Sequence, residues 1–286
     1  MELYVIEACQ HRDRREIYHK VIKAMLDRLL VVGRNADGLW YKQLRLPAAV
    51  PSSERLTDNW GYLYNSYYTF SLATNICERD RLPSFSLYEE EIGKTLKNIP
   101  KYSQYPWAGV PFDGYADSLE GALYLLNHMP LAEGFSWLDG EVATMFALFR
   151  GNGGSNLDGN LIRTALLYAL YKTQGTSVQP WQPGVMVGAY RHEGTLYLHI
   201  ETTTPWKGKL FFDHPRHKDF WQLPFDYPRL NSWPEWFVVE SDHMYRTTSN
   251  EPSLASMWEG NHLLQKGIDL ELTPAKPLDL AISAES

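Results

Sequence analysis

The apolar residues of this chain change their spacing once, near residue 175, and that change limits what the chain can fold into. Before it, as in 13–32, apolar residues recur every three or four positions, which is typical of one face of an α-helix. After it, as in 185–200, they alternate with polar residues, which is typical of a β-strand with one buried face. We therefore predict an α+β multidomain protein, with a helical domain at 1–175 and a β domain at 176–286.

The first domain is expected to hold about six helices joined as hairpins. Their predicted ranges are 13–32, 58–75, 86–98, 113–128, 135–149 and 158–174. Helix 58–75 is apolar or aromatic nearly all round and should be buried, and 113–128 is expected to be another buried helix, whereas 86–98 is polar and should lie outside. Gly175 stands where a helix stop is expected.

The second domain is expected to be an antiparallel β-sandwich, because its short strands are joined by proline-rich turns. The predicted strands are 185–189, 196–200, 208–212, 236–239, 269–272 and 278–282. Glu193 and Gly194 lie between the first two strands and predict a hairpin turn.

Three of the predicted helices begin in the same way. Asp58, Asp113 and Asp158 are each followed by a small or polar residue and then an apolar stretch. One interpretation is a degenerate repeat of a helical hairpin. The other is that aspartate is simply a good N-cap, because its carboxylate accepts hydrogen bonds from the first amide groups of a helix.

Carboxylates gather at the start of helix 113–128. Asp113 and Asp117 are four positions apart and share one face, and Glu120 lies on much the same face. Mutual repulsion would raise the pKa of one carboxyl group, which suits a general acid, while another stays ionised as base or nucleophile. We therefore name Asp113, Asp117 and Asp58 as candidate catalytic residues. An acidic first turn that complements the helix dipole is the alternative.

A second acidic pair, Asp139 and Glu141, follows Trp137. Residues two positions apart on a helix point in different directions, so the pair does not form one site. We favour a solvated first turn of helix 135–149 for both residues.

Aromatic residues make up 14% of the chain, with ten Trp and eighteen Tyr, which is more than a core needs. Flat aromatic rings pack well against the C–H faces of sugars, and Tyr and Trp add a polar group. The candidate substrate-binding residues of this kind are Trp60, Tyr62, Tyr105, Trp107, Tyr115 and Trp137. Core packing is the alternative for those on helices, whereas Tyr105 and Trp107 belong to a predicted loop.

Arg163 lies in an otherwise apolar helix, where a buried guanidinium needs a partner. It is a candidate for binding a substrate carboxylate through paired hydrogen bonds. An internal ion pair with one of the acidic residues is the alternative. His214 and His217 could bind a metal, but no third ligand has a suitable spacing, so we favour a polar loop.

Several classes of protein are disfavoured. No run of eighteen apolar residues could span a membrane, and a net charge of −7 argues against nucleic acid as the main partner. Two cysteines, Cys9 and Cys77, cannot form a disulfide framework or a Cys-rich zinc site. Motifs typical of nucleotide-binding proteins, serine hydrolases and metalloproteases do not occur. We expect no cofactor and no metal.

The N-terminal sequence lacks the basic-then-apolar order of a secretory signal. As it stands it predicts a cytoplasmic protein. If Met1 is not the native start, export remains open.

Four segments resemble the (α/α) toroid enzymes that act on polysaccharides. They are DNWGYLYNSYYTF, DGYADSLEGALYLLNH, WLDGEVATMFALF and DGNLIRTALLYALYKTQG. This broad group includes glucuronidase-like glycoside hydrolases and uronate polysaccharide lyases. The resemblance is one of architecture and covers roughly 13–286. It implies that a glycan binds where the inner helices begin and that a β domain covers one side.

A full toroid of this group has about twelve helices, so the resemblance covers about half a ring. The chain would be part of a longer enzyme, a shortened toroid, or one of two copies that complete the ring as a homo-oligomer.

The resulting hypothesis is a carbohydrate-active enzyme, a glycoside hydrolase that cleaves an acidic, uronate-containing or plant-type glycan. Asp117 or Asp113 would be the general acid, with the other or Asp58 as base or nucleophile. The first alternative is a polysaccharide lyase that acts on uronates by β-elimination, for which Asn59, Tyr64, Tyr115 and Arg163 are candidates. The second alternative is a non-catalytic glycan-binding protein. In each case the expected partner is an oligo- or polysaccharide.

Overall fold

The computed structural model of the protein describes residues 3–4, 7, 11, 13–77, 87–107, 113–151, 153–154, 158–231 and 233–285, with only the backbone of 75–77. This part of the chain is a mixed α+β protein with α-helices and antiparallel sheets. It divides into two compact units, which we name the helical unit (1–165 with 227–232) and the β unit (166–226 with 233–286). Cys9 and the side chain of Cys77 lie outside the described residues.

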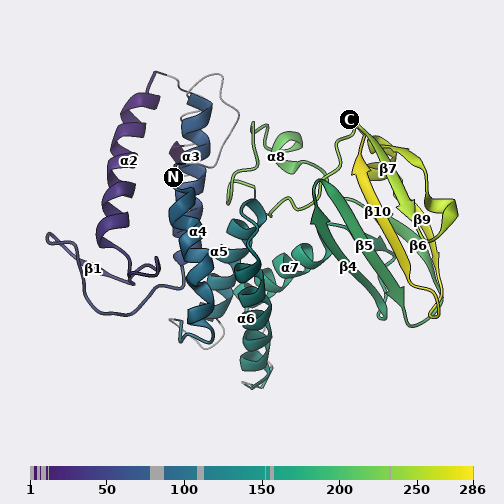
Figure 1. Ribbon diagram of the computed structural model, residues 1–286, viewed down its shortest axis with the longest axis horizontal. Helices are drawn as coiled ribbons and strands as arrows, with labels where there is room; N and C mark the ends of the chain where they lie inside the picture. The colour runs from purple at the N-terminus through teal and green to yellow at the C-terminus, as the bar shows by residue number, and fades with distance from the viewer. Residues whose placement is uncertain are drawn as a thin grey trace. The chain divides into compact units, whose positions relative to one another are not determined.

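The six predicted helices are confirmed, with ends that differ by a few residues. They are α2 (Arg15–Val32), α3 (Trp60–Cys77), α4 (Glu89–Asn98), α5 (Asp113–His128), α6 (Ala132–Gly151) and α7 (Gly159–Thr173), drawn in purple to teal in Figure 1. The 3-10 helix η1 (Ile99–Tyr102) follows α4, and a short hairpin of β1 (Leu44–Arg45) and β2 (Val50–Pro51) precedes α3. Gly175 ends α7 as predicted, with φ at 78° and its N–H donated to Leu170 O at 3.0 Å.

Two glycines allow α3 and α5 to pack backbone against backbone. A Cβ placed on Gly61 would lie 2.4 Å from the carbonyl carbon of Gly121, and a Cβ on Gly121 would lie 2.8 Å from the Cα of Gly61. Asn65 crosses this contact, because its Nδ2 donates hydrogen bonds to Gly61 O at 2.8 Å and Gly121 O at 3.0 Å. The two helices are therefore held at a separation that no larger side chain permits.

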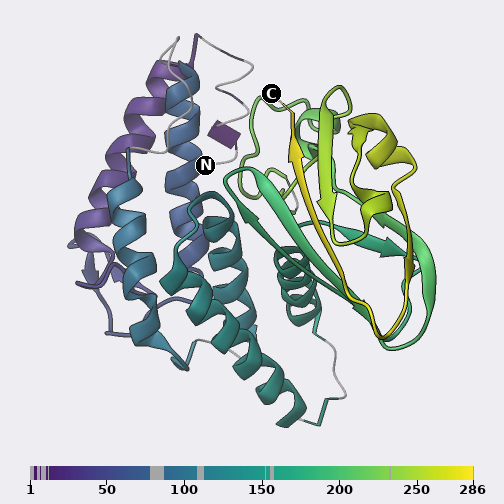
Figure 2. The same ribbon diagram turned by 45° about the vertical axis from the view of Figure 1, so that its right-hand side comes forward.

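Helix α2 packs on α3 but leaves most of its apolar stripe uncovered. Leu26 is its one buried residue among those described, and its carbonyl accepts a hydrogen bond from the Tyr67 hydroxyl at 2.9 Å. Ile17, Val21 and Met25 are 68%, 64% and 55% exposed. The helical spacing of these residues is real, yet nothing in the described chain covers them. Figure 2 shows α2 beside α3, on the outer side of the helical unit.

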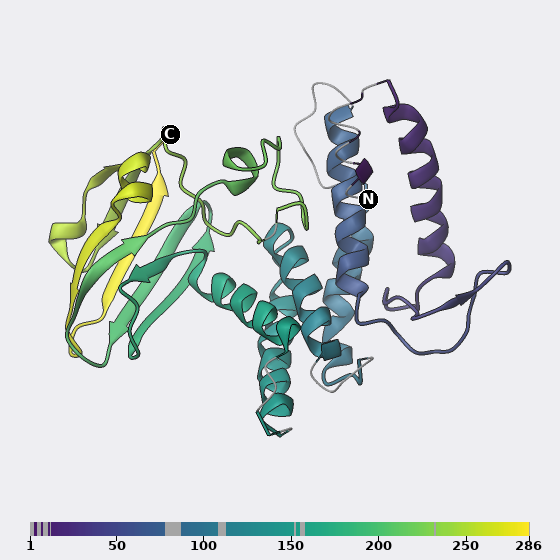
Figure 3. The ribbon, with the colours of Figure 1, turned by 180° about the vertical axis from the view of Figure 1, so that it is seen from behind.

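The β unit contains two antiparallel sheets. The larger has the strand order β4 (Val185–His192), β5 (Thr195–Thr202), β10 (Leu278–Ala284), β7 (Met244–Ser249) and β8 (Met257–Glu259). The smaller has the order β3 (Ser177–Gln179), β6 (Trp206–Phe211) and β9 (Ile268–Leu272). Short helices α8 (Arg216–Asp219), η2 (Pro252–Leu254) and α9 (Gly260–Gln265) lie between strands. Figure 3 shows the yellow β10 within the larger sheet.

Side chains from both sheets form one hydrophobic core. Leu198 and Ile200 of β5 and Leu280 of β10 belong to the same buried cluster as Leu210 of β6 and Leu270 of β9. The residues that alternate with them along β5 and β10 face solvent or are half-buried. This alternation is the pattern that predicted the strands, and the hairpin turn at Glu193–Gly194 is confirmed.

The predicted strand at 236–239 is wrong. Only Val238 pairs there, in a single bridge with Asp213, although Trp236, Phe237 and Val239 are buried. A continuous apolar run shows that a segment is buried but does not distinguish a strand from an extended loop. Strand β7, by contrast, has few apolar residues and was not predicted.

In the part of the chain that the structure describes, no helix combines the length and the apolar character that crossing a bilayer needs.

We expect Gly121→Ala to destabilise the protein, because the new methyl group would overlap the backbone of α3. Overpacking of this kind typically lowers the free energy of unfolding by about 1–3 kcal/mol. Gly140→Ala in α6 is the matched control, since its Cβ would meet nothing within 4 Å. It should stabilise the helix by up to about 1 kcal/mol. Urea unfolding of both variants measures the two effects, and equal stability would contradict the close backbone contact.

Candidate active site

The acidic residues proposed from the sequence lie at or near the N-terminal ends of α3, α5 and α7. Trp60 Nε1 donates a hydrogen bond to Ser118 Oγ at 2.7 Å, which joins the start of α3 to α5. Thr164 Oγ1 donates to Ala116 O at 3.0 Å, which joins α7 to α5. The candidate catalytic residues at these helix starts are Asp58, Asp113 and Asp117.

Asp58 lies in the turn before α3 and is 8% exposed. Its Oδ1 accepts hydrogen bonds from Asn59 Nδ2 at 2.7 Å and from Thr57 Oγ1 at 3.3 Å. The backbone amide of Asn59 donates a hydrogen bond to the Thr57 hydroxyl at 3.2 Å, so Thr57, and not Asp58, accepts this amide just before α3. N-capping therefore does not account for the burial of the Asp58 carboxylate.

The N-cap interpretation is confirmed at Asp158, whose Oδ1 accepts the amide of Asn160 at 2.7 Å. Asp113 is different, because its Oδ1 accepts the side-chain amide of Asn160 at 2.6 Å. Asn160 thus uses its backbone to complete the start of α7 and its side chain to orient a carboxylate of α5.

Asp117, Glu120 and Arg163 form the centre of the cluster. Arg163 donates from Nε to Glu120 Oε2, and its Nη2 lies 3.8 Å from Asp117 Oδ1. The Tyr62 hydroxyl donates to Glu120. The side chain of Arg163 is 43% exposed, that of Asp117 22% and that of Glu120 8%. The ion-pair interpretation of Arg163 is thus confirmed, while its guanidinium remains accessible.

The surroundings of Asp117 disfavour its charge. Burial, together with the negative charges of Asp113, Asp58 and Glu120, raises the pKa of its carboxyl group to about 6, and the positive charge of Arg163 offsets only part of this effect. A carboxyl group with this pKa exchanges its proton near neutral pH, as a general acid requires.

The aromatic candidates are mostly buried. Trp60 and Trp137 are edge to face, with ring centroids 5.9 Å apart. Five of the six candidates have exposed fractions of 9% or less: Trp60, Tyr62, Trp107, Tyr115 and Trp137. A role of these five in substrate binding stays a prediction.

Tyr105 is half-buried, and its hydroxyl accepts the amide of Leu56, two residues before Asp58, at 3.2 Å. Its ring centroid lies 4.7 Å from that of Trp107. Tyr105 therefore offers the most accessible ring among the aromatic candidates.

Glu141 was misjudged from the sequence. Helix α6 begins at Ala132, so Glu141 lies in its third turn instead of a solvated first turn, and it is 2% exposed. Its Oε1 accepts the amide of Gln104 at 2.8 Å, and its Oε2 has no partner among the described residues. Burial raises the pKa of this carboxyl group. Pro130, two residues before α6, was the available signal for the earlier start.

The predicted polar loop around His214 and His217 contains a partly buried pair. His217 Nδ1 lies 2.8 Å from Glu235 Oε2, and the amide of His217 donates to Glu235 Oε1 at 2.7 Å. The Glu235 carboxylate raises the pKa of His217. His214 Nδ1 lies 2.9 Å from Asp219 Oδ2, so each histidine has a carboxylate partner of its own.

Within the described residues, the one group with metal-ligand spacing is Glu240, Asp242 and His243. Asp242 and His243 are exposed, and Glu240 already pairs with Lys218 at 2.8 Å. The group lacks the buried, converging ligands of a structural metal site.

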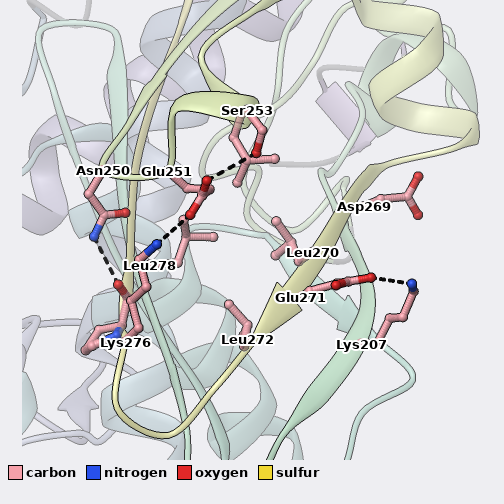
Figure 4. Close-up of a pocket in the computed structure, with 12 residues that line it drawn as sticks. Lys207, Asn250, Glu251, Ser253, Asp269, Leu270, Glu271, Leu272, Lys276 and Leu278 are labelled. Atoms are coloured by element: carbon pink, nitrogen blue, oxygen red, sulfur yellow. Dashed lines mark hydrogen bonds and ion pairs between the residues drawn. The ribbon is translucent and has the colours of Figure 1, made fainter.

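A cavity of about 640 Å³ lies in the β unit, and none of the candidate site residues proposed from the sequence lines it. Figure 4 shows the ion pairs at its rim, Lys207 with Glu271 and Lys276 with Glu251, the latter at 2.6 Å. Its floor is made by Leu270, Leu272 and Leu278. Because the charged groups at the rim are paired with one another, this cavity presents no acid–base arrangement comparable to that of Asp117.

Comparisons with protein-family models, with curated proteins and with solved structures find no match to this chain.

Asp117 should lower stability at neutral pH. Its pKa rises from the ordinary 3.8 to about 6 on folding, so the unfolded chain loses the proton first and stability falls as pH rises between these two values. We expect Asp117→Asn to increase the free energy of unfolding at pH 7.5, on the order of 2 kcal/mol, and to change it little at pH 4.

Chemical unfolding at both pH values measures this difference. Asp13→Asn, at an exposed turn before α2, is the matched control and should leave the pH dependence unchanged. A pH-independent effect of Asp117→Asn would show that its carboxyl group is not perturbed by its neighbours.

Proposed function

We propose that this chain is a glycoside hydrolase that cleaves an acidic, uronate-containing or plant-type glycan. The observation that carries the proposal is the meeting of Asp58, Asp113 and Asp117 beside the accessible guanidinium of Arg163. Glycosidases use two carboxyl groups on either side of the scissile bond, one as acid and one as base or nucleophile.

We assign the general-acid role to Asp117, because its raised pKa retains a proton that it can donate to the leaving oxygen. Asp113 is one helical turn away and is oriented by Asn160, which suits a base or nucleophile. Asp58 adds negative charge that supports the raised pKa of Asp117 and favours the cationic transition state of glycoside cleavage.

Arg163 supports an acidic substrate. Its Nε is bonded to Glu120, whereas its Nη groups make no hydrogen bond in the described part of the chain. A uronate carboxylate could accept hydrogen bonds from both Nη groups, in the paired geometry that a guanidinium group favours. This anchor would place the sugar ring over Asp117.

Elimination is less well supported. A lyase of this kind needs a tyrosine or histidine that takes up a proton, and burial raises the pKa of the Tyr62, Tyr64 and Tyr115 hydroxyls above their ordinary value. Their ionised forms are therefore disfavoured. The carboxylates of the cluster are better suited to hydrolysis.

The proposal includes a partial (α/α) toroid followed by a β-sandwich. The uncovered stripe of Ile17, Val21 and Met25 supports an incomplete ring, in which further helices, from a second copy or a longer chain, would cover α2. The shared core of the two sheets supports the sandwich.

Mass spectrometry of products from a panel of uronate-containing and plant oligosaccharides tests the proposal. We expect fragments whose masses sum to the parent plus one water. Asp117→Asn and Asp113→Asn should each lower turnover by about 10²–10⁴-fold with binding retained, while Asp13→Asn should not. Unsaturated fragments that sum to the parent mass would instead demonstrate a lyase, and binding without turnover would demonstrate a non-catalytic protein.

The pH profile gives an independent test of the acid. Because Asp117 must be protonated to act, turnover should fall as pH rises through about 6. Kinetics at saturating substrate between pH 4 and 8 would measure this limb. An unchanged limb in the residual activity of Asp117→Asn would assign the general acid to another residue.

A further inference from the structure

Two tyrosines form a stacked aromatic pair on the outer face of the larger sheet. Tyr190 of β4 and Tyr197 of β5 are direct partners in the strand register. Their ring centroids are 4.8 Å apart and their planes differ by 10°. Tyr190 is 60% exposed and Tyr197 is half-buried, so the stacked pair presents ring surface to solvent. A cross-strand pair stabilises a hairpin, but it does not need this exposure.

Gly188 creates a recess beside these rings. It lies two residues before Tyr190 and faces the same side of the sheet. A Cβ placed there would meet only His199 O, at 4.0 Å, and its φ is not among the positive ones. Neither packing nor backbone conformation therefore requires glycine at this position. Glycine also weakens the interior of a strand. A glycine that the fold itself does not need is consistent with the close approach of a ligand.

Small and polar side chains continue this face across β10 and β7. Ala281 is the register partner of Tyr197 and of Thr248, and its small side chain leaves open space above the sheet between them. His199 is the partner of Gly188, and its Nδ1 lies 2.7 Å from Asp279 Oδ1. The cavity above these residues has a volume of about 520 Å³.

The charge on this face indicates an uncharged ligand. His199 contacts both Asp279 and Glu201, and Arg246 pairs with Glu285, so these groups of the face carry no surplus of positive charge. An anionic polymer would need a surplus of cations, whereas sugar hydroxyls need donors and acceptors beside an apolar ring surface.

We propose that this outer face is a binding site for an uncharged polysaccharide. One pyranose ring stacks on an outward ring face of the Tyr190–Tyr197 stack, and the neighbouring sugar enters the recess over Gly188 and Ala281. The hydroxyls of the sugars bond with His199, Asp279 and Thr248. The site uses residues of the β unit alone and is independent of the carboxylate cluster and of hydrolysis.

Affinity electrophoresis of the full chain tests the site, in native gels that contain soluble xyloglucan, galactomannan, arabinoxylan or hydroxyethylcellulose. Polygalacturonate is the anionic comparison. We expect retardation by at least one of the uncharged polymers. Tyr190→Ala and Tyr197→Ala should weaken it about tenfold or more, as truncation of a central contact residue does. Tyr190→Phe should retain it, and Tyr18→Ala, at a 37% exposed tyrosine of α2, is the matched control.

Gly188→Val separates binding from folding. Valine favours a strand and fills the recess, so this variant should have a higher Tm and lose retardation. No retardation by any uncharged polymer, retardation by polygalacturonate alone, or equal retardation of wild type and Tyr190→Ala would overturn the proposal.

The same experiment distinguishes the two sites. Asp117→Asn should still be retarded while it loses hydrolysis, and Tyr190→Ala should still hydrolyse short oligosaccharides. Failure of one site therefore leaves the result for the other intact.

Discussion

The contact between Gly61 and Gly121 is the constraint on which the helical unit depends. With no side chain at either position, the backbones of α3 and α5 touch, and Asn65 bonds a carbonyl of each helix. Asp58 precedes one helix and Asp117 lies in the other, so the contact brings their negative charges close enough to interact. Larger residues at this crossing would separate the helices and weaken the electrostatic effect that distinguishes Asp117 from an ordinary surface carboxylate.

The carboxylate cluster lowers the free energy of unfolding, and the packing of the rest of the helical unit offsets this cost. Asp117 is held partly buried among like charges, and the guanidinium of Arg163 compensates only in part. The rings of Trp60 and Trp137 pack edge to face. Trp60 Nε1 is hydrogen-bonded to Ser118, whereas Trp137 Nε1 lacks a partner among the described residues. The raised pKa of Asp117 therefore follows from its burial and from its neighbouring carboxylates.

The spacing of apolar residues predicted the helices and most of the strands of the β unit, but not which side chains of different helices meet. The helices and the alternating strands followed from the apolar pattern, and the meeting of Asp113 and Asp117 followed from their spacing on one helix. The partner of Arg163 was anticipated only as one of several acids, because sequence spacing cannot show which residues of different helices meet. Glu141 was missed because its interpretation depended on where α6 begins, and helix ends are the least certain part of such a prediction. The strand at 236–239 was wrongly predicted because a buried extended loop and a paired strand both appear in the sequence as a run of apolar residues.

The place of β10 in its sheet has a consequence for how the chain folds during synthesis. β4 and β5 form a local hairpin that can close as soon as it leaves the ribosome, but β10 lies between β5 and β7 and is the last described strand in the chain. Until β10 arrives, the inner edge of β5 has unpaired backbone groups, and Leu196, Leu198 and Ile200 lack their neighbours in the core. A nascent β unit therefore passes through an incomplete state with an unpaired strand edge, whose duration depends on when β10 is synthesised and on the slow pairing of distant strands.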